Sequence, residues 1–160
     1  MTIAPIEKEV TVAAPPARAF EIFTRDMGRW WPRGKTVGAK PHAAIVIEPR
    51  AGGRWFERDD DGAETPWGTV LAWAPPARLV LGWRLDAAFK FDPDFVTEVE
   101  LTFRDAGEGR TRVTLVHRNL ERFGESAEKV AAQLGGGWPT MLGHFADFAA
   151  KHSSQKEPSK

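Results

Sequence analysis

The sequence predicts an α+β domain in which one curved antiparallel sheet of seven strands holds a long C-terminal helix. Between residues 42 and 118 the chain is a series of short segments with alternating apolar residues, separated by turn residues. After residue 126 the apolar spacing changes to three and four, which is typical of an amphipathic helix. Because strands twist, such a sheet curls, and its apolar concave face needs a cover that only the last helix is long enough to provide.

The N-terminal segment predicts one strand and a pair of short helices. Apolar residues alternate over Ile6–Val12, so this segment is expected to be a strand with one buried face. Pro15 and Pro16 end the strand and suit the first turn of a helix. The helical spacing of apolar residues that follows ends near Gly28.

Six further strands are predicted in a meander, at His42–Glu48, Arg54–Arg58, Trp67–Trp73, Leu79–Leu85, Phe95–Phe103 and Thr111–His117. In the third of these, strict alternation places Trp67, Leu71 and Trp73 on one face. Asp59–Gly62 is predicted to be a solvated hairpin turn. A calcium loop starting at Asp59 would need a glycine at position 64 and a carboxylate at position 70, where the chain has glutamate and valine.

The C-terminal region predicts two helical stripes separated by glycines. Ala127–Leu134 forms the first, with Ser126 as its N-cap. Gly135–Gly137 is expected to break the helix, because the Lys-Ser/Thr of a phosphate-binding loop does not follow it. A stronger stripe begins at Trp138, with a proline in its first turn. Residues 152–160 are polar and are predicted to be a disordered tail, so residues 1–151 form one domain.

Composition excludes several classes of protein. The 22 basic and 22 acidic residues give a net charge of zero, which argues against nucleic acid as a partner. Without cysteine there are no disulfides or thiolate sites, and the four histidines lack metal-ligand spacing, so no metal or cofactor is expected. The N-terminus does not resemble a signal peptide, and no apolar run is long enough to span a membrane. We therefore expect a cytoplasmic protein.

A curved sheet that grips one helix leaves an internal space unless large side chains fill it. The chain has seven Trp, ten Phe and no Tyr, and alternation directs several of these rings toward that space. A cavity there would bind mainly through apolar burial. The residues expected to contact a ligand are Trp30, Trp55, Trp67, Trp83, Phe103, His117, Trp138, Met141, Leu142 and Phe145.

Several motifs give the chain a family resemblance over about residues 5–151. They are Val12–Pro16 leading into Ala19–Phe23, Trp30–Pro32, Gly52–Trp55, Trp73–Leu79, Val113–His117 and Gly137–Leu142. In this order they resemble the SRPBCC (START-like, birch-allergen-like) superfamily, in particular the group called activator of heat-shock-protein-90 ATPase homologue-like. The resemblance implies the helix-grip fold. It also implies a role in binding hydrophobic ligands, carrying lipids, cyclising polyketides or acting on chaperones.

Three features admit a functional and a structural interpretation. In the functional interpretation, His117 is a general base or hydrogen-bond donor in the cavity, and Glu57, Asp86 or Asp92 is its acidic partner. In the structural interpretation, it is a histidine bonded to the backbone at the end of the sheet. Trp30–Trp31 is either a wall of the cavity mouth or plain core, since adjacent side chains point apart. Asp86–Phe95 is either a second lid or dimer contact, or a loop whose rings cover the sheet edge.

The function that these features favour is the binding of a small lipid-like, polyketide-like or aromatic ligand, without catalysis. One alternative is an enzyme of the cyclase or hydrolase type that uses His117 with an acid. Another is a module that interacts with a chaperone and has no ligand. A second copy of the chain is a further candidate partner.

Overall fold

The computed structural model describes residues 3–152, which form one sheet and four helical segments. In chain order the elements are β1 (Ile6–Val12), α1 (Pro16–Arg25), α2 (Met27–Trp30), β2 (His42–Ile47), β3 (Arg54–Asp59), β4 (Glu64–Ala74), β5 (Arg78–Trp83), β6 (Thr97–Gly107), β7 (Arg110–Arg118), the 3-10 helix η1 (Leu120–Ser126) and α3 (Ala127–His152). The α+β class and the pair of short helices after the first strand are confirmed.

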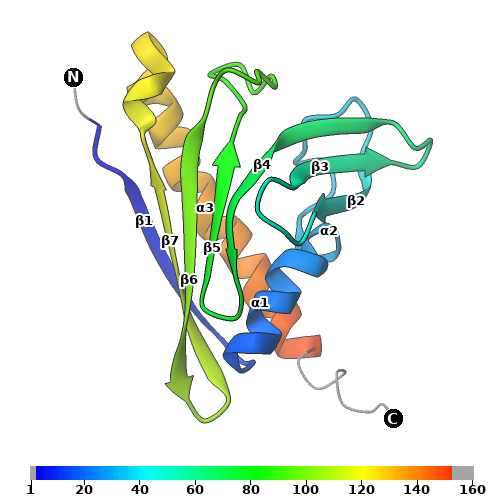
Figure 1. Ribbon diagram of the computed structural model, residues 1–160, viewed down its shortest axis with the longest axis vertical. Helices are drawn as coiled ribbons and strands as arrows, with labels where there is room; N and C mark the ends of the chain where they lie inside the picture. The colour runs from blue at the N-terminus through cyan, green and yellow to red at the C-terminus, as the bar shows by residue number, and fades with distance from the viewer. Residues whose placement is uncertain (1–2, 153–160) are drawn as a thin grey trace.

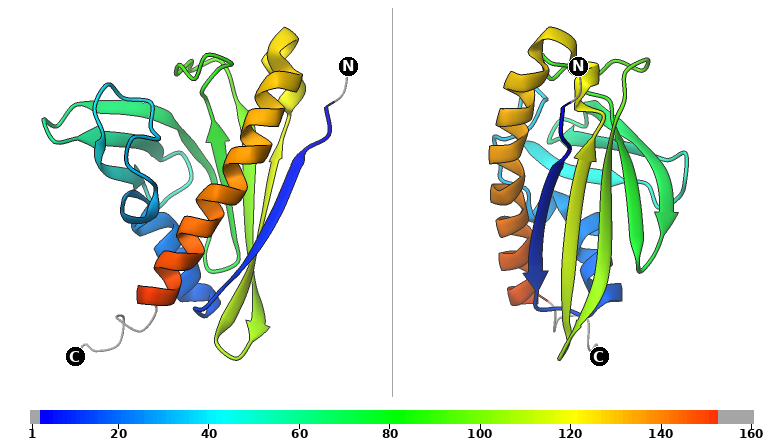
Figure 2. Two further views of the ribbon diagram at one scale, coloured as in Figure 1. Left: turned by 180° about the vertical axis from the view of Figure 1, so that it is seen from behind. Right: turned by 90° about the vertical axis from the view of Figure 1, so that its left-hand side faces the viewer.

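The seven strands form one antiparallel sheet in the order β1-β7-β6-β5-β4-β3-β2. Strands β2 to β7 are a meander, and β1 closes the other edge beside β7. The sheet curls around α3, which runs diagonally across its concave face (Figures 1 and 2). Apolar side chains of the sheet, α1 and α3 form a shared core, which confirms the helix-grip arrangement. No helix in residues 3–152 is long and apolar enough to cross a membrane.

The predicted break at Gly135–Gly137 is wrong, because α3 is continuous for 26 residues through these glycines and Pro139. Its buried side chains continue through the glycines at spacings of three and four: Ala127, Val130, Leu134, Trp138, Leu142, Phe145 and Ala149. Packing of this stripe against the sheet therefore outweighs the weak helix propensity of the segment. Pro139 lies on the exposed side of the helix rather than in a first turn. Ser126, predicted as the N-cap, is the last residue of η1, a helix that the sequence did not predict.

The predicted strict alternation along β4 is also wrong in the second half of the strand. The pairing of β4 with β5 shifts register between Val70 and Ala72, so a β-bulge interrupts the strand. Val70 is buried as a result, whereas Leu71, which alternation places on the inner face, is 39% exposed. Trp73 is half-buried and packs edge-on against Phe20 of α1 rather than facing the central space.

A glycine in β4 lets two tryptophans of the flanking strands meet. Gly68 pairs with Trp55 on one side and with Trp83 on the other. The two indoles contact edge to face with ring centres 6.0 Å apart. A Cβ atom on Gly68 would lie 1.8 Å from the carbonyl oxygen of Gly82, so no other residue fits here.

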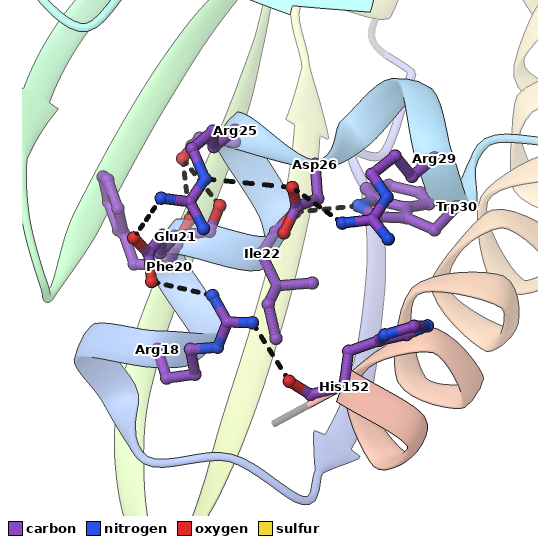
Figure 3. Close-up of polar contacts among 10 residues, drawn as sticks. Arg18, Phe20, Glu21, Ile22, Arg25, Asp26, Arg29, Trp30 and His152 are labelled. Carbon is purple, nitrogen blue, oxygen red and sulfur yellow. Dashed lines mark hydrogen bonds and ion pairs between the residues drawn. The ribbon is translucent and has the colours of Figure 1, made fainter. Parts of the chain in front are cut away.

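The C-terminal end of α3 is attached to α1 by a buried arginine. Arg18 donates one hydrogen bond to the carbonyl oxygen of His152 at 3.0 Å and another to Glu21 at 2.8 Å (Figure 3). The ring of His152 stacks on Phe148. His152 therefore belongs to α3 and not to the tail predicted from residue 152, and residues 153–160 lie outside the described residues.

Candidate ligand-binding site

A cavity of about 430 Å³ lies between the N-terminal half of α3, the sheet and two loops. These segments meet in the upper half of the views in Figure 2. The volume falls within the range of small-molecule sites. The lining residues are Trp31, Lys35, Thr36, Val37, Trp67, Trp83, Leu85, Ala88, Phe89, Gln133, Leu134, Gly137, Trp138 and Met141.

The structure places four of the ten predicted contact residues on the cavity wall: Trp67, Trp83, Trp138 and Met141. The other six are buried behind it: Trp30, Trp55, Phe103, His117, Leu142 and Phe145. Apart from the second half of β4, the facing of the strands was predicted, but sequence does not show how deep a side chain lies. The wall therefore consists of one layer of rings supported by a second layer of buried side chains.

Both Trp30 and Trp31 are buried, although neighbouring side chains were expected to point apart. Trp31 ends α2 in an extended conformation, which turns its ring away from the helix direction. Trp30 packs on Phe23 and Phe145 in the core. Trp31 packs on Trp67 and Trp138 and lines the cavity, so it is the member of the pair that forms a wall.

Three of the four cavity indoles have their N–H groups bonded inside the protein. Trp31 Nε1 donates to the carbonyl oxygen of Lys35 at 2.8 Å, Trp67 Nε1 to Glu57 Oε1 at 2.7 Å, and Trp138 Nε1 to His117 Nδ1 at 3.2 Å. These bonds fix the orientation of the three rings, because indole nitrogen is a donor only. The fourth, Trp83, has a buried Nε1 with no partner among the described residues.

Glu57 connects a loop and a tryptophan of the cavity wall through hydrogen bonds. Its Oε1 accepts hydrogen bonds from the backbone N–H groups of Val37 at 2.8 Å and Gly38 at 3.1 Å, in addition to the indole of Trp67. The side chain is almost completely buried. Glu57 is therefore the partner of a loop and a tryptophan rather than of His117. The alternating pattern in which Glu57 and Trp55 share a face did not predict this role, because the loop that Glu57 contacts is distant in the sequence.

His117 is fully buried behind Trp83 and Trp138. Since Trp138 donates to Nδ1, the ring proton is on Nε2, which donates to Thr97 Oγ1 at 2.8 Å. Burial lowers the pKa of His117 to about 3, because desolvation penalises the charged ring. The neutral ring thus has both nitrogens engaged and supports the wall without lining it.

The loop between β5 and β6 forms the rim opposite α3. Asp86 Oδ1 accepts hydrogen bonds from the N–H groups of Ala88 at 2.9 Å and Lys90 at 3.1 Å, which shapes the loop as a tight turn. Ala88 and Phe89 line the cavity, and Phe89 lies edge-on to Trp83. The loop therefore borders the cavity, and its role as a lid stays a prediction.

The chemistry of the cavity is that of an apolar pocket with few polar groups. Its polar side chains, apart from the tryptophans, are Lys35, Thr36 and Gln133. The lining contains no carboxylate and no histidine among the described residues. Nor does any group of three potential metal ligands occur within residues 3–152. The arrangement is suited to holding flat rings by stacking.

A second hollow of about 420 Å³ lies outside α1, and it has a different character. Its lining includes Phe20, Trp73 and an ion pair in which Arg25 contacts Glu21 at 2.6 Å. Because the two volumes are almost equal, size does not distinguish them. The charged groups of the second hollow satisfy each other, and its lining has one indole, whereas the first cavity is lined by four.

Comparison with known protein families decides the assignment. The family model of activator of Hsp90 ATPase homolog 1-like protein matches residues 13–150, almost the whole chain. The chain belongs to this family. The resemblance found in the sequence is confirmed, and the cavity described above is therefore that of an activator of Hsp90 ATPase homolog 1-like domain. Among curated proteins, no match was found.

Two similar solved structures exceed 30% identity. The anthrahydroquino-γ-pyrone synthase Txn09 complexed with SUM is 39% identical with a TM-score of 0.66, over 91% of this chain and 97% of that one. The self-sacrificing resistance protein CalC from Micromonospora echinospora is 32% identical with a TM-score of 0.72, over 96% and 98% of the two chains. The Aha1 dimer from Colwellia psychrerythraea is 15% identical with a TM-score of 0.63 over 92% and 97%, which shows a shared fold only.

Proposed function

We propose that the chain binds a flat, multi-ring aromatic molecule of the polyketide type in the cavity between α3 and the sheet. The observation that carries the proposal is the wall of four indoles, Trp31, Trp67, Trp83 and Trp138, around about 430 Å³. Three of these rings are held in place by hydrogen bonds, so the cavity is preorganised for a flat guest.

The similar structures support this ligand class. The name of the 39% identical synthase describes a product in which an anthrahydroquinone is joined to a pyrone, that is, a fused aromatic ring system. Stacking between rings adds to the apolar burial that such a ligand gains in an indole-lined pocket. A flexible alkyl chain would gain the burial alone and would lose more conformational freedom. We expect micromolar affinity for a three-ring aromatic, about −8 kcal/mol.

A cyclase-type enzyme is the second candidate, favoured by the same synthase. His117 is poorly suited to the role of general base, because it is buried, neutral and bonded at both nitrogens. Lys35 is the one titratable side chain on the described cavity wall. A cyclase built on this cavity would act mainly by holding a reactive chain in a folded conformation, with little acid–base help from the wall.

A matched pair of glycine variants tests the proposed site. Gly137 lines the cavity, and a Cβ atom there meets nothing within 4 Å. Gly136, its neighbour in α3, is exposed and equally unobstructed but does not line the cavity. Gly137→Leu should fill the cavity and weaken binding of anthraquinone-2-carboxylate at least tenfold, whereas Gly136→Leu should leave it unchanged. Calorimetric titration measures both, and circular dichroism checks folding.

Equal affinity of Gly137→Leu and the parent would place the ligand elsewhere, and equal loss in both variants would indicate damage to α3. The family name also raises a chaperone-interacting role. That role predicts stimulation of an Hsp90 ATPase that is indifferent to Gly137→Leu, because it requires an outer surface and not the cavity.

A further inference from the structure

The lining of the cavity beside α3 changes from exposed to buried across its width. Lys35, Ala88 and Gln133 are exposed, and they come from three segments: the loop after α2, the loop between β5 and β6, and α3 itself. On the same lining, Trp67 is only 2% exposed and Trp138 only 3%. The exposed residues therefore mark the mouth of the cavity, and the indoles form its inner end.

Two neighbouring rows of α3 residues give the direction in which the mouth lies. Gln133, Gly137 and Met141 follow each other at a spacing of four and are exposed or half-buried. Leu134 and Trp138, each one position further along the chain, are buried. Because residues four apart lie one above another on a helix, the first row borders the mouth and the second row borders the interior.

Gly137 leaves a gap in the row that borders the mouth. It has no side chain, and a Cβ atom there meets nothing within 4 Å. The side chains of Gln133 and Met141 lie about one helical turn away on either side of it. The mouth is therefore widest beside Gly137, where part of a bound molecule can reach water.

The inner end of the cavity is closed by a second layer of buried side chains. Trp55 and His117 in this layer are fully buried. Trp55 packs edge-on against Trp67 and Trp83. His117 lies against Trp83 and Trp138. A hydrophilic group placed at this end would lose its water in surroundings that consist mainly of aromatic rings, which is unfavourable.

We propose that the ligand is an aromatic ring system with a hydrophilic extension at one end, whose rings lie among the indoles and whose extension leaves the cavity beside Gly137. The inference rests on the proposed function and narrows its ligand class. Molecules extended at one end are bound, and molecules extended at both ends are excluded. Gly137 and Gln133 are then the residues that determine which extensions pass.

Four amides of anthraquinone separate the two ends of the ligand. The 2-(N-methylcarboxamide) is the short form, and the same amide with a hexaethylene glycol chain on its nitrogen is the extended form. The 2,6-bisamides with two short or two extended arms are the second pair. In calorimetric titrations, one extension should change the dissociation constant by less than about twofold, because a chain that stays in water keeps its solvation and its conformational freedom. Two extensions should weaken binding by about tenfold or more relative to the short bisamide, since one chain must then enter the aromatic interior.

A tryptophan beside the gap tests where the extension leaves. Gln133→Trp should narrow the mouth and weaken the singly extended amide by about fivefold or more relative to the short amide. Ala132→Trp is the matched control, because Ala132 is an exposed neighbour in α3 that does not line the cavity, and it should keep the ratio of the parent. Circular dichroism checks the folding of both variants, and the ratios in the parent test the inference without either of them.

The outcomes distinguish this inference from the proposed function. If the short amide binds and a single extension weakens it as strongly as two extensions weaken the bisamide, the inference is overturned while the cavity stays a site for aromatics. Equal affinities of the short and the extended bisamide overturn it too, because the inner end would then be open. An unchanged ratio in Gln133→Trp contradicts the exit beside Gly137. If neither short amide binds, the proposed function itself fails.

Discussion

His117 lies between Trp83 and Trp138, fully buried, with its two nitrogens bonded to Trp138 and Thr97. A buried histidine with both nitrogens bonded affects the cavity through the side chains that it positions. It fixes the ring of Trp138 by accepting its N–H, and it backs the ring of Trp83. The contribution of His117 to binding is therefore indirect, and its main effect should be on stability.

The titration of His117 predicts a loss of stability in mild acid. Burial lowers the pKa of folded His117 to about 3, whereas an unfolded histidine titrates near 6.5. Between these pH values the unfolded chain binds a proton that the folded chain does not. The free energy of unfolding is therefore reduced as the pH falls below 6.5, by up to several kcal/mol.

Urea midpoints measured from pH 8 to pH 4 check this linkage. The decline below pH 6.5 should be shallower in His117→Phe and unchanged in His144→Gln, since His144 is exposed on α3. An identical decline in the parent and in His117→Phe would mean that His117 becomes protonated in the folded protein.

Glu57 provides a second prediction at the scale of a residue. Glu57→Ala leaves the N–H groups of Val37, Gly38 and Trp67 without their common acceptor. We expect the free energy of unfolding to fall by about 3 kcal/mol and aromatic ligands to bind more weakly, because Val37 and Trp67 line the cavity. Glu57→Gln keeps one acceptor oxygen and should lose less. Denaturation and binding of both variants give the answer, and a neutral Glu57→Ala would contradict the role.

At the scale of elements, α3 shows where sequence reasoning succeeds and where it stops. The apolar stripes on either side of Gly135–Gly137 were predicted, and most of their residues are buried. Ala131, Met141 and Phe148 are partly buried. That the two stripes form one continuous helix was not predicted, because the three glycines and the proline have low helix propensity. The stripe is stabilised by contacts with the distant sheet, which periodicity within the helix does not reveal.

The same reason explains the errors in the sheet and in the site. The bulge near Val70 changes the facing of Leu71, and nothing in the alternating pattern marks it. The meander and the presence of an aromatic-lined space could be predicted from alternation, whereas the pairing of β1 with β7 was not predicted. Trp67 and Trp83 lie on the wall of this space, and Trp55 lies behind it. This arrangement depends on packing between strands at Gly68, which is a long-range contact.

The glycines of α3 predict a gain in stability on substitution. A Cβ atom on Gly136 meets nothing within 4 Å, and the residue is helical and exposed. Gly136→Ala should therefore stabilise the protein by about 0.5–1 kcal/mol through helix propensity. Gly62→Ala is the contrasting control, since its φ of +87° favours glycine and should make the change destabilising. A urea midpoint for Gly136→Ala at or below that of the parent would show that α3 is not helical there.

For the whole molecule, two hollows of similar size lie at different places: one between α3 and the sheet, and one outside α1. The zero net charge gives no long-range attraction to charged surfaces, so recognition depends on local chemistry. The cavity beside α3 is lined by four indoles and, within the described residues, by no acidic side chain. The hollow outside α1 is lined by one indole, Trp73, and by an ion pair, so the aromatic wall is what distinguishes the cavity proposed as the ligand site.

The indole N–H signals of the protein test this account most directly. The seven tryptophans give seven indole signals in a ¹H–¹⁵N correlation spectrum, which single Trp→Phe variants assign. On titration with anthraquinone-2-carboxylate, the signals of Trp31, Trp67, Trp83 and Trp138 should move most, because these four rings line the cavity. Shifts confined to Trp73, or no shifts at all, would contradict the account, because the ligand would then occupy the hollow outside α1 or not bind.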